Sequence, residues 1–210
     1  RKELGNHDPR GSVYGVAIRW SGNWPQPAQY SVKGRFVGLG LNAVGRIPGF
    51  AGASGHLDGD ERGGTLYLNS QGAAVELPRV FREKLAFDML TAQVGWEKKG
   101  EQYELKLNNI SFSSPELAGS VSGTYQTTAD SPGVLDLSGN VTRAEARGIG
   151  RYIPLQVGAR GRQWLDNAFL GGTSSDVKVR LKGNLDDFPF PEGKNGVFHV
   201  TARISGGVLD

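Results

Sequence analysis

The residues of this chain that could carry out acid–base, nucleophilic or metal chemistry are few and scattered. The chain has no cysteine, which excludes a disulfide scaffold, a thiolate zinc site and a cysteine nucleophile. His7, His56 and His199 have no partner at the spacing of a metal site or a catalytic triad, and no Gly-x-Ser-x-Gly motif occurs. Several aspartates could form the carboxylate pair of a glycoside hydrolase, but turn and cap roles explain their positions: Asp136, Asp166, Asp176, Asp186 and Asp187. We therefore expect no catalytic residues, no metal and no cofactor.

Two glycine-rich segments begin like binding loops and then depart from the pattern. Asp58–Gly63 starts like a calcium loop, but Arg62 occupies the fifth position and Asn69 stands where a bidentate glutamate belongs. Gly38–Gly40 begins like a dinucleotide loop, but Ile47–Gly49 does not open a helix. The first segment is typical of a polar hairpin, and the second does not predict a nucleotide site.

Composition limits the classes of partner. Of the 210 residues, 32 are glycine, about twice the ordinary share of roughly 7 %. Lys and Arg number 24 against 21 Asp and Glu, and the two signs are interspersed along the chain, so no nucleic-acid-binding patch is predicted. No stretch reaches the roughly 18 consecutive apolar residues of a membrane span. The last residues resemble the start of another strand, so we expect one β-rich segment, residues 1–210, of a longer protein.

Apolar and polar residues alternate with a period of two through most of the chain, which indicates half-buried strands. The apolar positions fall in about ten segments, centred on residues 14–20, 30–36, 66–68, 75–77, 103–107, 110–112, 117–125, 135–141, 177–185 and 198–204. Turn sequences separate many of them, at Asp60–Gly64, Lys98–Glu101, Ser131–Gly133 and Glu192–Gly196. Glycines on the apolar register permit bends. We predict a mainly β fold, a strongly curved antiparallel meander.

Two short helices are expected near residues 143–170. Thr142 and Glu145 have the spacing of a capping box, which predicts a helix from about Arg143 to Tyr152. A second helix is predicted from about Arg160 to Leu170, where one stripe of apolar side chains would lie against the sheet: Trp164, Leu165, Ala168 and Phe169.

Ten strands would form a sheet about 50 Å wide with one apolar face, and two short helices can cover only part of it. The remainder needs a second sheet, closure into a barrel, or an apolar ligand. Periodicity does not choose among these three.

Several strings of the sequence are distinctive enough to suggest a family. They are Arg151–Leu155, Trp164–Gly172 and Val179–Phe190, with Phe36–Asn42, Ile47–Gly49, Gly55–Asp60 and Phe198–Asp210 as weaker matches. The chain resembles the YhdP branch of the AsmA-like proteins, which are large proteins of the Gram-negative envelope. These strings are structural, so they indicate a family and no catalytic site.

The resemblance implies a segment of a periplasmic β-groove. Such a groove binds phospholipid by its acyl chains and carries the phospholipid between the inner and outer membranes. It also implies an inner-membrane anchor outside residues 1–210 and contacts with neighbouring segments of the same longer chain. Trp164, Leu165 and Phe169 would cover part of the groove. The groove-lining candidates are Val16, Ile18, Val32, Leu66, Leu68, Leu105, Leu107, Val121, Leu135, Leu137, Val179, Leu181, Val200 and Ile204.

Two other functions stay open at this point. A scaffolding domain would seal its apolar face with its own chain or a protein partner. A carbohydrate-binding domain would need aromatic residues on the polar register, where Tyr67 is the main candidate.

Overall fold

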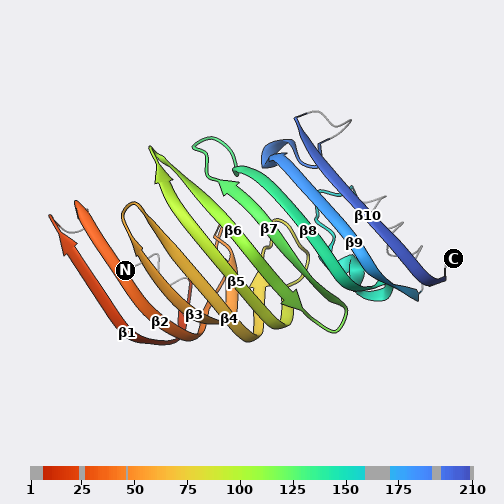
Figure 1. Ribbon diagram of the computed structural model, residues 1–210, viewed down its shortest axis with the longest axis horizontal. Helices are drawn as coiled ribbons and strands as arrows, with labels where there is room; N and C mark the ends of the chain where they lie inside the picture. The colour runs from red at the N-terminus through yellow and green to blue at the C-terminus, as the bar shows by residue number, and fades with distance from the viewer. Residues whose placement is uncertain (1–6, 24–26, 46, 159–170, 191–194, 209–210) are drawn as a thin grey trace.

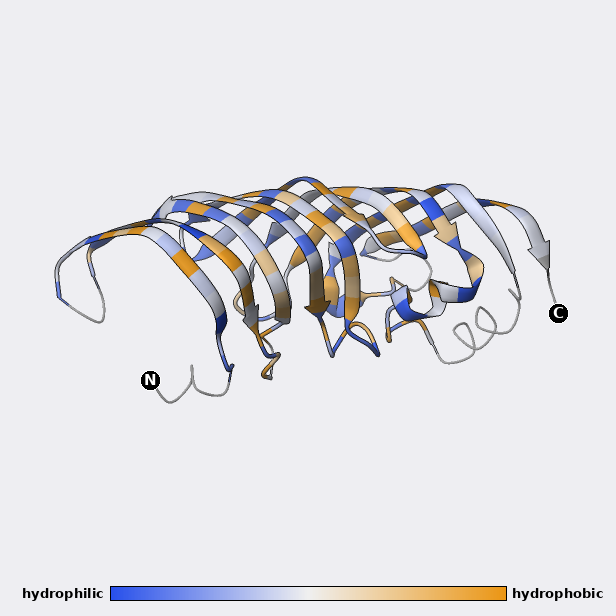
Figure 2. Ribbon diagram, turned by 90° about the horizontal axis from the view of Figure 1, so that it is seen from below, coloured by the Kyte–Doolittle hydropathy of each residue, from blue (hydrophilic) through white to orange (hydrophobic). Residues whose placement is uncertain are grey.

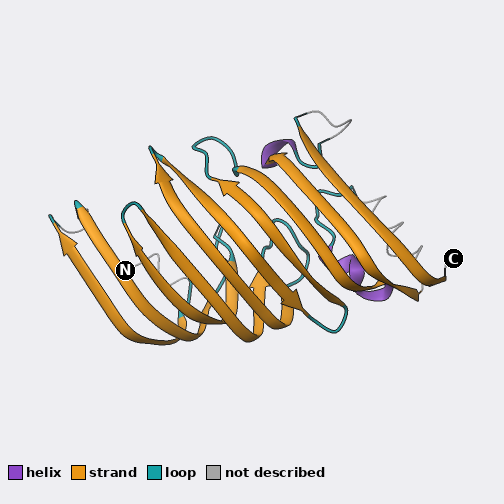
Figure 3. Cartoon of the chain, in the orientation of Figure 1, coloured by secondary structure: helices purple, strands orange, loops and turns teal. Residues whose placement is uncertain are grey.

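A computed structural model describes residues 7–23, 27–45, 47–158, 171–190 and 195–208, and within them a single sheet dominates (Figures 1 and 3). The sheet has ten strands in sequence order, and each pairs antiparallel with the next along the chain. The strands are β1 (Arg10–Ser21), β2 (Gln29–Leu41), β3 (Gly49–Asp60), β4 (Gly63–Glu76), β5 (Leu85–Lys99), β6 (Gln102–Ser113), β7 (Leu117–Gln126), β8 (Val134–Glu145), β9 (Gly171–Asn184) and β10 (Gly196–Val208). The predicted mainly β antiparallel meander is therefore confirmed.

The sheet is open. β1 and β10 each pair with one neighbour and not with each other, so no barrel closes. Within the described ranges, all ten strands belong to this one sheet, and no second sheet lies over it. For the described residues, closure into a barrel and a second covering sheet are therefore excluded as ways to cover the apolar face.

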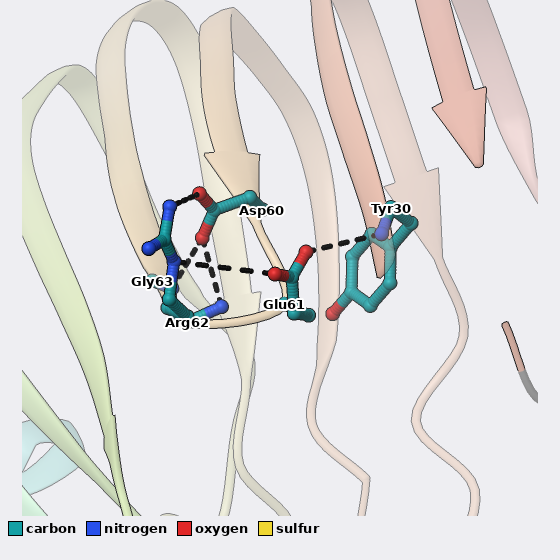
Figure 4. Close-up of polar contacts among 5 residues, drawn as sticks. All are labelled: Tyr30, Asp60, Glu61, Arg62 and Gly63. Atoms are coloured by element: carbon teal, nitrogen blue, oxygen red, sulfur yellow. Dashed lines mark hydrogen bonds and ion pairs between the residues drawn. The ribbon is translucent and has the colours of Figure 1, made fainter. Parts of the chain in front are cut away.

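The predicted turns Asp60–Gly64, Lys98–Glu101 and Ser131–Gly133 each join consecutive strands, whereas most of Glu192–Gly196 lies outside the described residues. The first is held by its own carboxylates (Figure 4). Asp60 Oδ1 accepts hydrogen bonds from the backbone N–H groups of Arg62 (2.8 Å) and Gly63 (3.0 Å), and these lower the pKa of Asp60. Glu61 Oε2 accepts a hydrogen bond from Tyr30 N at 3.0 Å, which ties the turn to β2. These contacts support a polar hairpin.

The predicted segments do not correspond one to one with the strands. Residues 66–68 and 75–77 both fall in or beside β4, and residues 103–107 and 110–112 both fall in β6. The prediction missed β3 and β5 and divided β4 and β6 into two segments each. The predicted number of strands therefore agrees with the observed ten only because the two kinds of error cancel. The splits have a physical cause, since left-handed residues, Gly72 (φ +64°) and Asn109 (φ +46°), interrupt the alternation within β4 and β6.

Left-handed glycines in adjacent strands lie beside one another. A Cβ added to Gly52 in β3 would lie 2.8 Å from the Gly72 carbonyl oxygen in β4, and one added to Gly11 in β1 would lie 2.7 Å from that of Gly38 in β2. The pairing register shifts near Gly38 and Gly52, as expected of β-bulges. Bulges bend strands, and Figure 2 shows the strands bending over, with loops below the sheet.

Serine side chains bond to backbone groups beside these bulges. Ser54 Oγ in β3 accepts a hydrogen bond from Gly38 N in β2 at 3.0 Å. Ser70 Oγ in β4 likewise accepts one from Ser54 N at 2.9 Å, and the Ser70 side chain is fully buried. Both serines thus provide an acceptor for a backbone N–H beside a bulge. The bond to Ser70 is the more buried of the two, and an unpaired N–H in a buried position costs about 1–3 kcal/mol.

The first predicted helix is shorter and begins later than expected. β8 continues to Glu145, and a 3-10 helix, η1 (Ala146–Tyr152), follows it. The capping box is wrong, because Glu145 makes no side-chain cap and Thr142 lies in the strand, where its hydroxyl donates to the Ala118 carbonyl at 3.3 Å. Pairing of Ala144 with β7 and β9 outweighs the local helix signal.

The second predicted helix, with Trp164, Leu165 and Phe169, lies outside the described residues. A further 3-10 turn that was not predicted, η2 (Leu185–Asp187), follows β9. Asn184 caps it through a side-chain oxygen that accepts a hydrogen bond from Asp186 N.

We predict that Gly72→Ala lowers the free energy of unfolding by about 1–2 kcal/mol, because an L-residue is strained at a left-handed φ. An added Cβ meets nothing within 4 Å there, so the effect isolates backbone strain. Gly95→Ala in β5 is the matched control, since it has no positive φ and its Cβ would meet only the Gly64 carbonyl oxygen, at 3.9 Å. Urea unfolding of both variants measures the difference, and equal stabilities would contradict the bulge assignment.

Candidate functional site

The pairing register places every groove-lining candidate on one face of the sheet, here called the apolar face. Paired residues of an antiparallel sheet point to the same side, so a face can be followed from strand to strand. One row runs Leu57, Leu66, Val94, Leu107, Gly123, Leu137, Leu181 and Phe198 from β3 to β10. A second contains Leu68, and a third contains Val121, Val179 and Val200. Val16 shares the side of Ile18 and lies against Gly34, while Ile204 joins through Ser174 and Ala144.

One row on the apolar face crosses all ten strands. From β1 to β10 it consists of Ile18, Val32, Gly59, Gly64, Trp96, Leu105, Tyr125, Leu135, Gly183 and Gly196. No charged side chain interrupts it. The row runs across the strands, so it follows the long dimension of the sheet in Figure 1.

Aromatic rings fill the glycine positions of this row. Added Cβ atoms on Gly59 and Gly64 would lie 2.6 and 2.4 Å from Trp96 Cζ2, so the indole lies over both glycines. At the other end, the Phe190 ring lies as closely over Gly183 and Gly196 and is only 4 % exposed. Phe190 in turn contacts Phe188 with ring centroids 5.8 Å apart. The row is therefore apolar along its whole length, including at its glycines.

Much of the apolar face is open to solvent. Ile18 is 57 % exposed, Trp20 60 % and Val200 49 %. The accessible surface of the chain is 13542 Å², whereas a compact monomer of this mass has about 9,500 Å². A single-layered sheet with one uncovered face accounts for such an excess.

η1 covers the part of the apolar face that β7 and β8 form. Its Ile149 and Tyr152 pack against a buried cluster of Leu117, Val141 and Ala144. Phe112 and Val177 complete this cluster from β6 and β9. The face is thus closed beneath η1 and open towards β1.

Polar contacts attach η1 to the β6–β7 connection. The Tyr152 hydroxyl lies 3.0 Å from the buried Ser114 hydroxyl and 3.4 Å from Glu116 Oε2. Arg151 Nη1 lies 3.3 Å from the same Glu116 oxygen. The position of η1 over the cluster is therefore determined by a specific network as well as by apolar packing.

A second contact joins the segment after η1 to the β4–β5 connection. Leu155 N donates to the Val80 carbonyl at 2.8 Å, and Gln156 Nε2 donates to the Arg79 carbonyl at 2.7 Å. Together with the contacts of Glu116, these bonds join three chain connections that are distant in sequence.

The opposite face is polar. One row on it contains Lys33, Asp58, Lys106, Asp136 and Lys182, and another contains His56, Tyr67 and Gln93. Lys33 Nζ lies 2.7 Å from Asp58 Oδ2, and the His56 and Tyr67 rings stack at 4.5 Å. The alternating hydropathy along the strands in Figure 2 reflects these two faces.

The polar face carries charge networks between side chains of neighbouring strands. Arg180 Nη1 lies 2.5 Å from Asp136 Oδ1, and this contact, with Lys182 nearby, lowers the pKa of Asp136. No cluster of three or more His, Asp or Glu side chains with the arrangement of a metal site occurs in the described ranges. His199 lies on the polar side of β10, paired with Arg180, as its alternation predicted.

The sequence reasoning missed several apolar-face residues. Leu57, Val94 and Trp96 contribute to the two longest rows but lie on strands that were not recognised. The alternation of Leu90, Ala92, Val94 and Trp96 was a usable signal for β5. It was obscured because Leu85 and Phe87, on the other register, are also apolar.

Among the described residues, no helix has the length and apolar character needed to cross a membrane. A family model described as YhdP protein matches residues 1–210, the whole chain. No curated protein matches the sequence, and no solved structure matches the fold.

We predict that Val141→Asp and Ile18→Asp have very different effects on stability, although both residues belong to the apolar face. Val141 is 8 % exposed beneath η1, so a carboxylate there should cost several kcal/mol and unfold the domain. Ile18 is exposed, so Ile18→Asp should change the free energy of unfolding by about 0.5 kcal/mol or less. Thermal unfolding monitored by circular dichroism separates the two. A large loss of stability in Ile18→Asp would show that this end of the face is covered.

Proposed function

This chain belongs to the YhdP family, and we propose on that basis that it is a segment of a hydrophobic groove that binds phospholipid acyl chains. In the intact protein the groove conducts phospholipid between the inner and outer membranes of the Gram-negative envelope. The role is binding and guidance without a chemical step, so no catalytic residue, metal or cofactor is required.

The observation that carries this proposal is the apolar row that crosses all ten strands, from Ile18 to the Phe190-covered glycines. An acyl chain on this row would be removed from water along its length. Each buried methylene would contribute about 0.8 kcal/mol to the free energy of binding. Because the row runs across the strands, the chain could move from one strand to the next while contacting similar side chains. That is the property a conduit needs.

The bending of the strands supports a groove rather than a flat surface. Bulges at Gly38, Gly52 and Gly72 fall within consecutive strands, and η1 lies on the apolar face. The apolar face would then be the inner surface of a strongly curved sheet, with the polar face outside. This arrangement would expose lysines and aspartates to the periplasm and shield acyl chains.

The two ends of the sheet support continuation into neighbouring segments. β1 and β10 each use only one of their two edges in the described chain. We propose that preceding and following segments of the same longer chain extend the groove there, and that the membrane anchor lies among them. The fragment would occupy the periplasm, tethered to the inner membrane through those segments.

η1 supports a second candidate function, a scaffold whose apolar face is sealed. It already covers Leu117, Val141 and Ala144 and is anchored through Glu116. If the predicted helix at 160–170 covers more of the face through Trp164, Leu165 and Phe169, acyl chains would have less room. The two functions differ in whether phospholipid occupies the face.

Mass spectrometry of an organic extract tests this directly. The domain would be expressed in the bacterial periplasm and purified without detergent, beside an unrelated protein of equal size. We expect phospholipid to co-purify in near-stoichiometric amount with the domain and not with the control. A lipid-free, folded and monodisperse domain would favour the scaffold.

Charge substitution then locates the lipid. Val121→Asp and Leu181→Asp each place a carboxylate on the apolar face at half-buried positions in the middle of β7 and β9. We expect co-purified phospholipid to fall about tenfold or more, because acyl chains would contact an unpaired charge. Ser122→Asp, one residue from Val121 but on the polar face, is the matched control and should retain lipid. Undiminished loading in a folded variant with Asp at both 121 and 181 would overturn the groove assignment.

A further inference from the structure

The polar face has a hollow that the groove function does not use. It has a volume of about 750 Å³ and lies over β6–β10, on the side opposite the proposed acyl-chain groove. Its position follows from the register, in which Ser122 pairs with Ser138, Ser138 with Arg180, and Arg180 with His199. The residues of this row thus face the same side as the hollow that they line.

The hollow exists because short side chains adjoin long ones. Ser120, Ser122 and Ser138, whose side chains are short, line it from β7 and β8. Lys178 and Arg180 line it from β9 and rise above the serines. Its lining is completed by polar residues, Asn109, Asn140, Asp176 and His199, and by Val121, Gly139 and Val179 between them.

Arg180 is held in place at the wall of the hollow. Its Nη1 atom lies 2.5 Å from Asp136 Oδ1 and donates to the Leu137 carbonyl at 2.8 Å. A guanidinium has five donors in a planar fork, so one nitrogen can serve as the anchor while others remain available to a ligand.

Positive charge is in excess around the hollow. Lys178 lies 4.0 Å from Asp176, while Lys182, at 3.4 Å, shares Asp136 with Arg180. Three cations are therefore matched by two carboxylates. On the same face, Lys33 and Asp58 form a one-to-one pair by comparison.

We propose that this hollow binds a sugar that carries a phosphate or a carboxylate. Arg180 and Lys178 would bind the oxyanion, and a guanidinium matches the geometry of both groups. Serine hydroxyls and asparagine amides both donate and accept hydrogen bonds, as sugar hydroxyls require. The volume lies within the 300–1,000 Å³ range of small-molecule sites and leaves room for a sugar ring beside the anion.

This site is independent of the acyl-chain groove, because neighbouring residues of each strand point to opposite faces. Val121 and Val179 also border the hollow, but the register directs their side chains to the apolar face, whereas those of Ser122 and Lys178 face the hollow. A loss of sugar binding and a loss of lipid are therefore separable results.

Isothermal titration calorimetry at low ionic strength provides the test, with glucose 6-phosphate, glucuronate, glucose and inorganic phosphate as probes. We expect glucose 6-phosphate and glucuronate to bind at least tenfold more tightly than glucose or inorganic phosphate. Arg180→Gln combined with Lys178→Gln should weaken both acidic sugars at least tenfold. Lys106→Gln, on the same face but outside the hollow, should leave them within twofold.

Ser138→Gln is a second variant, which fills the hollow without removing the Arg180 to Asp136 ion pair. It should also weaken the acidic sugars while circular dichroism and co-purified lipid stay unchanged. Any of three results would overturn the proposal: no measurable binding of the acidic sugars, binding equal to that of inorganic phosphate, or full binding in the folded double variant.

Discussion

The strand register is the constraint on which the rest of this structure depends. A sheet with one layer has no opposing sheet to select its buried side, so the two faces are distinguished only by keeping the period-two alternation in phase through every pair. A slip of one residue between β4 and β5 would place Leu66 and Leu68 on the same side of the sheet as Lys106. The apolar row that crosses all ten strands would be broken at that pair.

The bulges preserve that phase while allowing the strands to bend. A left-handed residue shifts the alternation within its own strand, and Gly52 in β3 lies beside Gly72 in β4, so the shifts in these two neighbouring strands coincide. Ser54 and Ser70 then provide hydrogen-bond acceptors for backbone groups at these positions. The abundance of glycine in the chain is thus partly explained by bending, and partly by positions over which Trp96 and Phe190 lie.

The two faces differ in their physical character and hence in what they can bind. The apolar face is a continuous strip that suits a long, uniform and flexible ligand. The polar face has local charge networks, and around Arg180 they leave a hollow with an excess of cations. The sheet could therefore bind one kind of molecule on its apolar face and another on its polar face.

The sequence by itself determined the mainly β class, the antiparallel meander, several of the turns and the alternation that puts Val16, Leu105 and Leu181 on apolar registers. These depend on local periodicity and turn chemistry, which act within a few residues. The distinctive sequence segments also indicated the YhdP family, and the family model that matches residues 1–210 agrees with this assignment. Only the tertiary structure decided that β3 and β5 complete the rows, that pairing extends β8 through the expected helix start, and that the sheet stays open. It alone brought Arg180 beside Ser138, because such contacts arise from the pairing of distant strands, which no local pattern encodes.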